Sequence, residues 1–295
     1  MKVRCLQTTG EGFFKEVEYE KNEPAQDEIE VRAVMTGVCR SDIDMMSGDF
    51  GPLPLHMQGH EGLGIITRIG SEIHNVKVGE YVATRGEPAY ADMYNVRKDE
   101  FVPVPTAHPR YILEPVACGI HLISQNLNEF QTRTGGRVLI IGSGFLAWVA
   151  RNKLLDYHFY VDVLGNHNIN LWGTELIKSA KENYDIVIDL SGKYQIGTDI
   201  KLNNNALIID AVGKEVSRGE AEQQLWRACT TVRPSPRHKN FINAMWDAKN
   251  KIQMGNLDVD KFWTQAYNRD TEWQQAFADG MDRPSGYSRG YIVWR

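Results

Sequence analysis

The segment RVLIIGSGFLA, residues 137–147, constrains the fold of this chain more than any other part of the sequence. A mostly apolar, strand-like run leads into Gly142 and Gly144, and Ala147 completes the spacing G-x-G-x-x-[GA]. In this pattern the first glycine permits a tight turn, the second lets the backbone approach a pyrophosphate, and the small third residue allows close helix packing. The helix that follows offers N–H groups and a partial positive charge. The segment therefore predicts a strand, a dinucleotide-binding turn and a helix.

The alternative is an ordinary glycine-containing turn between a strand and a helix, and the surrounding sequence argues against it. Apolar runs at 158–165, 184–192 and 206–213 alternate with helical stretches such as 145–155. Near-continuous apolar strands separated by helices are typical of a parallel sheet that is covered on both faces. We therefore expect a doubly wound α/β domain in this part of the chain.

The rest of the chain has a different pattern. Short strand-like runs bounded by glycine or proline fill the first hundred residues, at 28–34, 62–70 and 80–86. The tail adds two helix-like stretches, at 239–254 and 272–279, and a final strand at 291–295. Gly255 and Gly280 follow the two stretches, and a glycine just past the last turn commonly ends a helix. These patterns predict a second, β-rich domain.

Composition excludes several classes of protein. At roughly 100–200 residues per domain, a chain of 295 residues is expected to form about two domains. A net charge of −5 argues against binding to nucleic acid. The most apolar run, 138–150, is too short and too rich in glycine to cross a membrane, so we expect a cytoplasmic protein. The cysteines lie far apart with no C-x-x-C pair, which argues against a disulfide framework and a cysteine-rich zinc knot; they are Cys5, Cys39, Cys118 and Cys229.

A second set of motifs offers metal ligands: GVCRSD at 37–42, GHE at 59–61 and LEP at 113–115. Thiolate, imidazole and carboxylate are good zinc ligands, and three protein ligands with one open position are typical of a catalytic site. Cys39, His60 and Glu114 are too far apart in sequence for one helix, so they would have to come from separate loops. Taken singly, each has an ordinary explanation: a small buried thiol, a hydrogen-bonded polar residue, and an exposed acid before a helix.

The fingerprint also calls for an acid at the end of the second strand, where it binds the adenosine ribose. Asp162 has the right spacing from Gly142, but Val163 and Leu164 follow it, so it could lie inside the strand. The strand would then end at Gly165, Asn166 and His167 without a carboxylate. That arrangement favours NADP over NAD, because no charge repels a 2′-phosphate and both polar side chains could donate to it. The alternative is that Asn166 and His167 form a plain polar turn.

Several of these stretches occur in the order seen in a known family. GVCRSDIDMMSGDF, GHEGLGIITRIGSEIHNVKVGEYV, ILEPVACGIH and GSGFLA follow one another, and the later strands YDIVIDLSG, ALIIDAVG and YIVWR extend the match over nearly the whole chain. The chain resembles the zinc-dependent medium-chain dehydrogenase/reductases, and most of all their polyol and sugar branch. The resemblance implies a GroES-like catalytic domain over 1–115 and 260–295 and a Rossmann dinucleotide-binding domain over 116–259.

The resemblance also assigns residues to a metal site. In the family, the matching cysteine, histidine and, in this branch, glutamate bind the catalytic zinc, which implies Cys39, His60 and Glu114 here. Glu61 resembles an acid that lies beside the metal and sometimes ligates it. One catalytic zinc is therefore expected.

Further positions match residues with catalytic and cofactor-binding roles. Ser41 matches a hydroxyl that hydrogen-bonds the substrate alcohol, and Asp42 matches an acid that orients the ligand histidine, a common arrangement at metal sites. The residues expected to bind the dinucleotide are Gly142, Ser143, Gly144, Phe145, Leu146, Asn166 and His167.

The chain departs from the family pattern in three places. Residues 86–95 stand where a four-cysteine structural zinc lobe would fall, so no structural zinc is expected. Asp44 stands where some alcohol dehydrogenases carry a histidine that relays protons. The chain is also short between its second and fourth Rossmann strands, which affects the adenosine pocket.

These assignments imply an oxidoreductase that transfers hydride between a nicotinamide cofactor and an alcohol, polyol or sugar, or reduces a ketone or aldehyde in reverse. A zinc-free reductase of the quinone or enoyl type and a non-catalytic nucleotide-binding protein are the alternatives. The substrate pocket is expected to be lined by residues near Phe50, Tyr90 and the C-terminal segment. Family resemblance implies a homodimer or homotetramer, with the apolar runs near Val212 and Val232 as candidates for joining sheets across subunits.

Overall fold

The computed structural model describes residues 1–8, 12–48, 58–166, 169–180, 183–194, 196, 199–211, 230–232 and 239–294. The chain forms two compact units, Met1–Pro115 with Met245–Arg295, and Val116–Ala244. The second unit therefore ends earlier in the chain than the domain boundary expected at 259/260. That domain boundary remains a prediction.

The first unit is built on antiparallel strands. Its main sheet has the order β13-β14-β3-β4-β5-β7, β6 also pairs with β3, and β1 and β2 form a separate pair. The strands of this unit are β1 (Lys2–Thr8), β2 (Phe14–Glu20), β3 (Glu28–Gly37), β4 (Gly62–Ile69), β5 (Tyr81–Thr84), β6 (Met93–Arg97), β7 (Phe101–Val104), β13 (Trp263–Asn268) and β14 (Arg289–Val293). Its helical elements are α1 (Arg40–Met46), α8 (Trp273–Asp282) and the 3₁₀ turns η2 (Pro109–Tyr111) and η3 (Asp260–Phe262).

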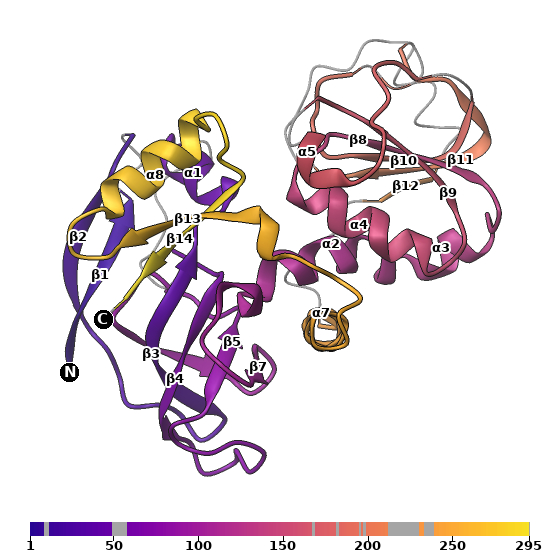
Figure 1. The fold of residues 1–295 in the computed structure, drawn as a ribbon. Coiled ribbons are helices and arrows are strands. Elements are labelled where there is room, and N and C mark those ends of the chain that lie inside the picture. The colour runs from indigo at the N-terminus through magenta and orange to yellow at the C-terminus, as the bar shows by residue number, and fades with distance from the viewer. Residues whose placement is uncertain are drawn as a thin grey trace. The chain divides into compact units, whose positions relative to one another are not determined.

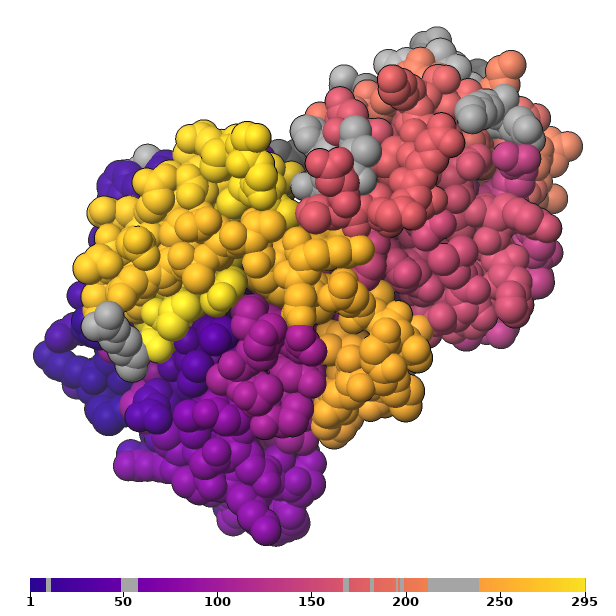
Figure 2. Space-filling model, in the orientation of Figure 1, coloured from indigo at the N-terminus to yellow at the C-terminus, as the bar shows by residue number. Residues whose placement is uncertain are grey.

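Residues from the end of the chain complete this unit. β14 pairs with β3, placing Tyr291 opposite Gly37, and Figure 2 shows the yellow C-terminal segment as a continuous area of the unit's surface. Helix α8 lies beside α1 (Figure 1). The predicted β-rich domain is thus confirmed, and the C-terminal strand belongs to its sheet.

The end of helix α8 differs from the sequence prediction. The helix runs through Gly280 to Asp282, and Arg283 takes the left-handed conformation at its end, with φ of 49°. A Cβ at Gly280 would lie 3.2 Å from Val38 Cγ1 and 3.3 Å from Ile43 Cδ1. Gly280 therefore provides close packing of α8 on the α1 region, and its prediction as a helix stop was wrong.

The second unit contains the predicted parallel sheet. Its order is β12-β11-β10-β8-β9, and helices α2, α3 and α4 gather on one side of it (Figure 1). The strands are β8 (Arg137–Ile141), β9 (Tyr160–Leu164), β10 (Tyr184–Asp189), β11 (Leu202–Asp210) and β12 (Thr230–Val232). The helices are α2 (Glu114–Ser124), α3 (Leu127–Gln131), α4 (Phe145–Leu155), α5 (Ile169–Trp172) and α7 (Phe241–Gln253), of which α2 and α7 cross the unit boundaries.

Strand β8 marks the point where the order of the sheet reverses. β9 pairs with one side of β8 and β10 with the other, so the turn at Gly142 lies where open α/β sheets bind ligands. The six-stranded form of this fold has another strand beyond β9. In the part of the chain that the structure describes, that position holds only a parallel bridge between Leu164 and Ile177. The short segment noted in the sequence corresponds to this reduced edge.

Among the described residues, none of the helices is both long enough and apolar enough to span a lipid bilayer.

Candidate functional site

Cys39 lies immediately before helix α1, and the pattern C-x-x-D has a local structural cause. The Cys39 backbone N–H donates to Asp42 Oδ2 at 3.0 Å, as in a capping box at a helix start. Asp42 is completely buried, whereas Cys39 and Ser41 are half-buried. Ser41 Oγ donates to Cys39 Sγ at 3.3 Å. The first turn of α1 therefore places the thiol, the hydroxyl and the carboxyl in one small volume.

His60 and Glu61 come to the same place from the start of β4. Gly59 has a φ of +71°, a left-handed conformation that favours glycine, and it turns the chain just before His60. The ligand atoms of Cys39, His60 and Glu61 all lie within 4.8 Å of one another. His60 Nδ1 is 3.7 Å from Asp42 Oδ1, consistent with the expected role of Asp42 beside the histidine. Residues from two separate segments therefore converge into a group that could hold a metal ion.

Arg289 binds the carboxylate of this group. Its Nη2 donates to Glu61 Oε1 at 2.6 Å and to Oε2 at 2.5 Å, across 228 residues of sequence. Glu61 is completely buried, and the guanidinium also lies over the Trp263 ring, 4.9 Å from its centroid. A Cβ at Gly37 would lie 2.0 Å from Glu61 Oε2, so the first glycine of GVCRSD leaves room for this acid.

Charges within the group shift its pKa values. Burial raises the pKa of the Cys39 thiol and Glu61 raises it further, while His60 lowers it. Burial lowers the pKa of His60, but Asp42, Glu114 and Cys39 outweigh burial and raise that pKa well above its ordinary value. Burial lowers the pKa of Arg289, and Glu61 and Cys39 reverse the effect and raise it. These shifts favour the protonated forms of Cys39, His60 and Arg289.

Glu114, the third zinc ligand implied by the resemblance, begins helix α2. It is 3% exposed, so it is not the exposed acid that its sequence position alone allowed. With Asp42 and Cys39, it is one of the groups that raise the pKa of His60 against the effect of burial. Among the described residues, the group of ligand atoms within 4.8 Å of one another contains Glu61 and does not contain Glu114.

The expected dinucleotide turn has the geometry that its glycines predict. Gly142 has a φ of +109°, which a residue with a side chain adopts at a cost. A Cβ at Gly144 would meet open space, and Ala147 is buried in helix α4. Residues 143–146 link the end of β8 to the first turn of α4, and Ser143 is buried. The turn is thus shaped for close approach by a ligand.

Trp172 and Gly165 lie close to Ser143. Trp172 Nε1 donates to the Ser143 carbonyl oxygen at 2.9 Å. A Cβ at Gly165, just after β9, would lie 2.5 Å from Ser143 Oγ and 3.0 Å from its backbone nitrogen. Gly165 therefore allows the end of β9 to approach the turn.

The position of Asp162 bears on which residues could bind the adenosine ribose of a dinucleotide. Asp162 lies in the middle of β9, opposite Leu139, and accepts hydrogen bonds from Tyr184 Oη at 3.0 Å and Arg137 Nη2 at 3.4 Å. The strand ends at Leu164, and Asn166 after it is exposed. His167 and Phe50 lie outside the described residues.

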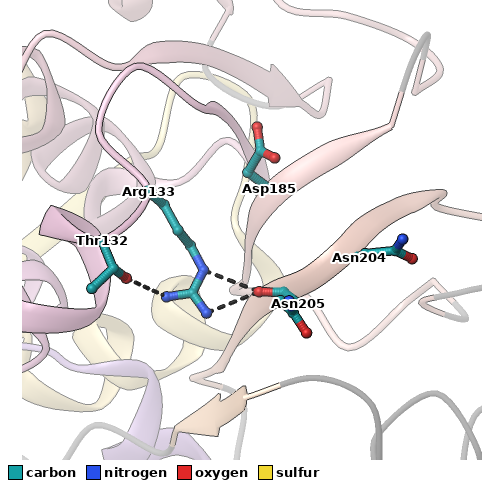
Figure 3. A pocket seen from close by; sticks show the side chains of 5 residues that line it. All are labelled: Thr132, Arg133, Asp185, Asn204 and Asn205. Atoms are coloured by element: carbon teal, nitrogen blue, oxygen red, sulfur yellow. Dashed lines mark hydrogen bonds between the residues drawn. The ribbon is translucent and has the colours of Figure 1, made fainter.

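A separate cavity in the second unit is not part of this site. It has a volume of about 320 Å³ and is lined by Thr132, Arg133, Asp185, Asn204 and Asn205 (Figure 3). Asp185 is near the amino end of β10, whereas the glycine turn follows the carboxyl end of β8. The Arg133 guanidinium is turned to the Asn205 carbonyl oxygen, 2.9 Å from Nη2.

The sequence did not single out Arg289. No local motif marks Arg289, which meets Glu61 only because β14 pairs with β3. Tyr90 is completely buried and its Oη lies 2.5 Å from Asp42 Oδ2. The expected substrate pocket near Tyr90 stays a prediction.

Known proteins that this chain resembles in sequence include alcohol and polyol dehydrogenases. Residues 25–106 match the alcohol dehydrogenase GroES-like domain. The chain is 26% identical over 228 residues to D-arabinitol dehydrogenase 1 of Uromyces fabae, covering 59% of this chain and 64% of that enzyme. The chain spans between 19% and 64% of the length of eight curated dehydrogenases that it matches.

Solved structures share the fold over nearly the whole chain. An alcohol dehydrogenase superfamily protein from Novosphingobium aromaticivorans has a TM-score of 0.82 and 18% identity, with 100% of both chains covered. A quinone oxidoreductase of Pseudomonas syringae has a TM-score of 0.79 and 18% identity, covering 99% of this chain and 100% of that one. The matched domain and the related dehydrogenases support the resemblance to the alcohol dehydrogenase-like group of the medium-chain dehydrogenase/reductases, and the solved structures show that the chain shares their fold.

Proposed function

We propose that this chain is a zinc-dependent, NAD(P)-linked dehydrogenase of an alcohol, polyol or sugar, and in reverse a reductase of a ketone or aldehyde. The observation that carries the proposal is the convergence of Cys39, His60 and Glu61, with ligand atoms within 4.8 Å of one another. Thiolate, imidazole and carboxylate suit zinc. The related D-arabinitol dehydrogenase supports a polyol as substrate.

Cys39, His60 and Glu114 are proposed as the zinc ligands. Both oxygens of Glu61 accept hydrogen bonds from Arg289, so ligation by Glu61 would break that pair. Glu114 is buried and its charge acts on His60. Glu61 would then contribute negative charge beside the metal. Zinc at this position supplies Lewis-acid chemistry that makes a substrate hydroxyl more acidic.

Ser41 is proposed to accept the proton of the substrate alcohol. Its Oγ is half-buried and lies 3.3 Å from Cys39 Sγ, so it is next to a proposed ligand and within reach of solvent. Asp42 would keep the tautomer and orientation of His60 fixed through the ring nitrogen that faces it.

The proposed cofactor is a nicotinamide dinucleotide, with NADP favoured over NAD, and it supplies the hydride acceptor. Residues 142–146 would hold its pyrophosphate, with the open side of Gly144 toward the ligand. Asp162 is held inside β9 by Tyr184 and Arg137, so it is a poor candidate for the ribose hydroxyls. Asn166 and His167 are the proposed polar contacts to a 2′-phosphate.

We also propose the domain limits 1–115 with 260–295 and 116–259, and a homodimer or homotetramer. In the described part of the sheet, β12 lies at one edge, so the run near Val232 has the position needed for pairing between subunits.

A metal-free reductase of the quinone type is the second candidate. The pairing of Glu61 with Arg289 favours it, because a buried carboxylate neutralised by arginine needs no cation. A protein that binds a nucleotide without catalysis is the third. Metal content separates the first two, and oxidation or reduction of any substrate excludes the third.

The test combines metal analysis of the purified chain with nicotinamide absorbance at 340 nm on polyols, sugars and short alcohols, in both NAD and NADP. We expect about one zinc per chain and turnover with NADP. His60→Ala should lose both, whereas His74→Ala, a change at an exposed histidine of the same unit, should keep both. A fully active His60→Ala variant would exclude the zinc mechanism.

A further inference from the structure

We propose that Tyr90 is a positioning residue for His60 and that it acts through Asp42. The inference rests on the proposed zinc site, because its effect is on how a ligand histidine is held. Tyr90 lies in the connection between β5 and β6 and is completely buried, so its side chain is not exposed to solvent.

The hydroxyl of Tyr90 binds the carboxylate of Asp42. Tyr90 Oη lies 2.5 Å from Asp42 Oδ2 and 3.0 Å from the Gly37 carbonyl oxygen. A phenol has one hydrogen to donate, and a hydrogen bond to an ionised acceptor is the stronger one. The proton of Tyr90 is therefore assigned to Asp42.

This bond determines which oxygen of Asp42 faces the histidine. Oδ2 also accepts the Cys39 backbone N–H at 3.0 Å, so two donors fix this oxygen. Oδ1 is buried and has no hydrogen-bond partner among the described residues, and it lies 3.7 Å from His60 Nδ1. The donors on Oδ2 thus leave Oδ1 directed at the ring nitrogen.

The ring of Tyr90 is itself held firmly. Phe14 and Phe277 stack on each other with centroids 4.0 Å apart, and each meets Tyr90 edge to face, at 5.9 Å and 5.4 Å. Such arrangements are favourable for aromatic pairs. Because β2 and α8 supply these two phenylalanines, elements from both ends of the chain fix the position of the hydroxyl.

Tyr90 also contacts the backbone that carries His60. A Cβ at Gly59 would lie 2.6 Å from Tyr90 Cγ and 2.7 Å from its backbone nitrogen. The neighbouring Ala89 N–H donates to the Gly59 carbonyl oxygen at 2.8 Å. One residue therefore supports His60 twice, through the backbone before it and through the carboxylate that faces its ring.

The test uses two Tyr→Phe variants that each remove one tyrosine–aspartate hydrogen bond. Tyr90→Phe keeps the packed ring and removes the bond to Asp42. The matched control is Tyr267→Phe, since Tyr267 is also buried and its Oη lies 2.5 Å from Asp279 Oδ2, outside the metal-ligand group. The measurements are the zinc dissociation constant, by competition with a chromophoric chelator, and urea unfolding without zinc.

We expect Tyr90→Phe to weaken zinc binding about 10-fold, the lower end of the range for residues that orient metal ligands. Tyr267→Phe should change the zinc dissociation constant by less than about twofold, because the Asp279 carboxylate that it binds is not in the metal-ligand group. Equal changes in zinc affinity for the two variants would overturn the role of Tyr90.

Asp42→Asn completes a double-mutant cycle. If Tyr90 acts through Asp42, adding Tyr90→Phe to Asp42→Asn should cause little further loss of zinc affinity, whereas fully additive losses would overturn the proposal. Should Tyr90→Phe fail to fold, unchanged zinc affinity in Asp42→Asn alone would also overturn it. A wild-type chain that binds no zinc would overturn the proposed function and this inference together. The outcomes for the Tyr90→Phe and Asp42→Asn variants would overturn this inference alone.

Discussion

Replacing Arg289 with methionine tests the electrostatics of the site. Methionine keeps the length and apolar stem of arginine but removes the charge that neutralises Glu61. Glu61 is completely buried and the Arg289 side chain is 11% exposed, so the pair is shielded from water. Removing one partner of a buried pair costs about 3–5 kcal/mol, because the other charge stays buried and uncompensated. Loss of the guanidinium over Trp263 adds about 0.5–2 kcal/mol.

The assay is urea unfolding followed by tryptophan fluorescence, with and without zinc. Without zinc, Arg289→Met should lower the free energy of unfolding by about 3.5–7 kcal/mol, the two losses together. With saturating zinc, the decrease in the free energy of unfolding should be smaller by about 1.4 kcal/mol or more, because the cation takes over from Arg289 the neutralisation of Glu61. That difference equals a tenfold gain in the zinc affinity of the variant. The double variant with Glu61→Gln should recover part of the zinc-free loss, since neither charge remains. A decrease in unfolding free energy below about 1 kcal/mol would contradict this role of the Arg289 charge, and so would a decrease that neither zinc nor Glu61→Gln changes.

Three further predictions concern proton transfer, pH and the glycine turn. Ser41→Ala should retain zinc and slow turnover about 100-fold or more; steady-state rates equal to wild type would remove its assigned role. Zinc affinity should rise with pH. Burial and Glu61 raise the pKa of Cys39, and the acids around His60 raise the pKa of His60 despite its burial. Zinc must displace a proton from each of these two side chains, and it does so more easily at higher pH. Calorimetry in buffers of different ionisation enthalpy should detect proton release on binding, and pH-independent affinity would contradict it. Gly165→Ala should lower the free energy of unfolding by about 1–3 kcal/mol. The new Cβ should also displace Ser143 and so weaken dinucleotide binding, which is measured by titration with the dinucleotide. Unchanged cofactor affinity would argue against a link between Gly165 and the dinucleotide turn.

Features set by neighbouring residues could be predicted from the sequence. The turn at Gly142 follows from apolar β8 and a glycine that adopts a φ of +109°. The spacing of Cys39 and Asp42 likewise has a local cause, the bond between the Cys39 N–H and the Asp42 carboxylate. Because such interactions span a few residues, the sequence pattern carries them directly.

Features that depend on distant segments could not be predicted. Nothing near Glu61 shows that Arg289, 228 residues away, binds it. The expected stop at Gly280 was wrong for a similar reason, because this glycine packs closely against Val38 and Ile43 on another segment. The family resemblance pointed to Cys39, His60 and Glu114, whereas the group of ligand atoms within 4.8 Å of one another contains Glu61 in place of Glu114.

X-ray absorption at the zinc edge of the metal-loaded chain would show whether Cys39 and His60 hold one zinc ion. We expect a single sulfur neighbour at about 2.3 Å and nitrogen or oxygen neighbours at about 2.0–2.2 Å, with the sulfur lost in Cys39→Ser. A zinc surrounded only by nitrogen and oxygen in the wild-type chain, or a sulfur that persists in Cys39→Ser, would contradict this expectation.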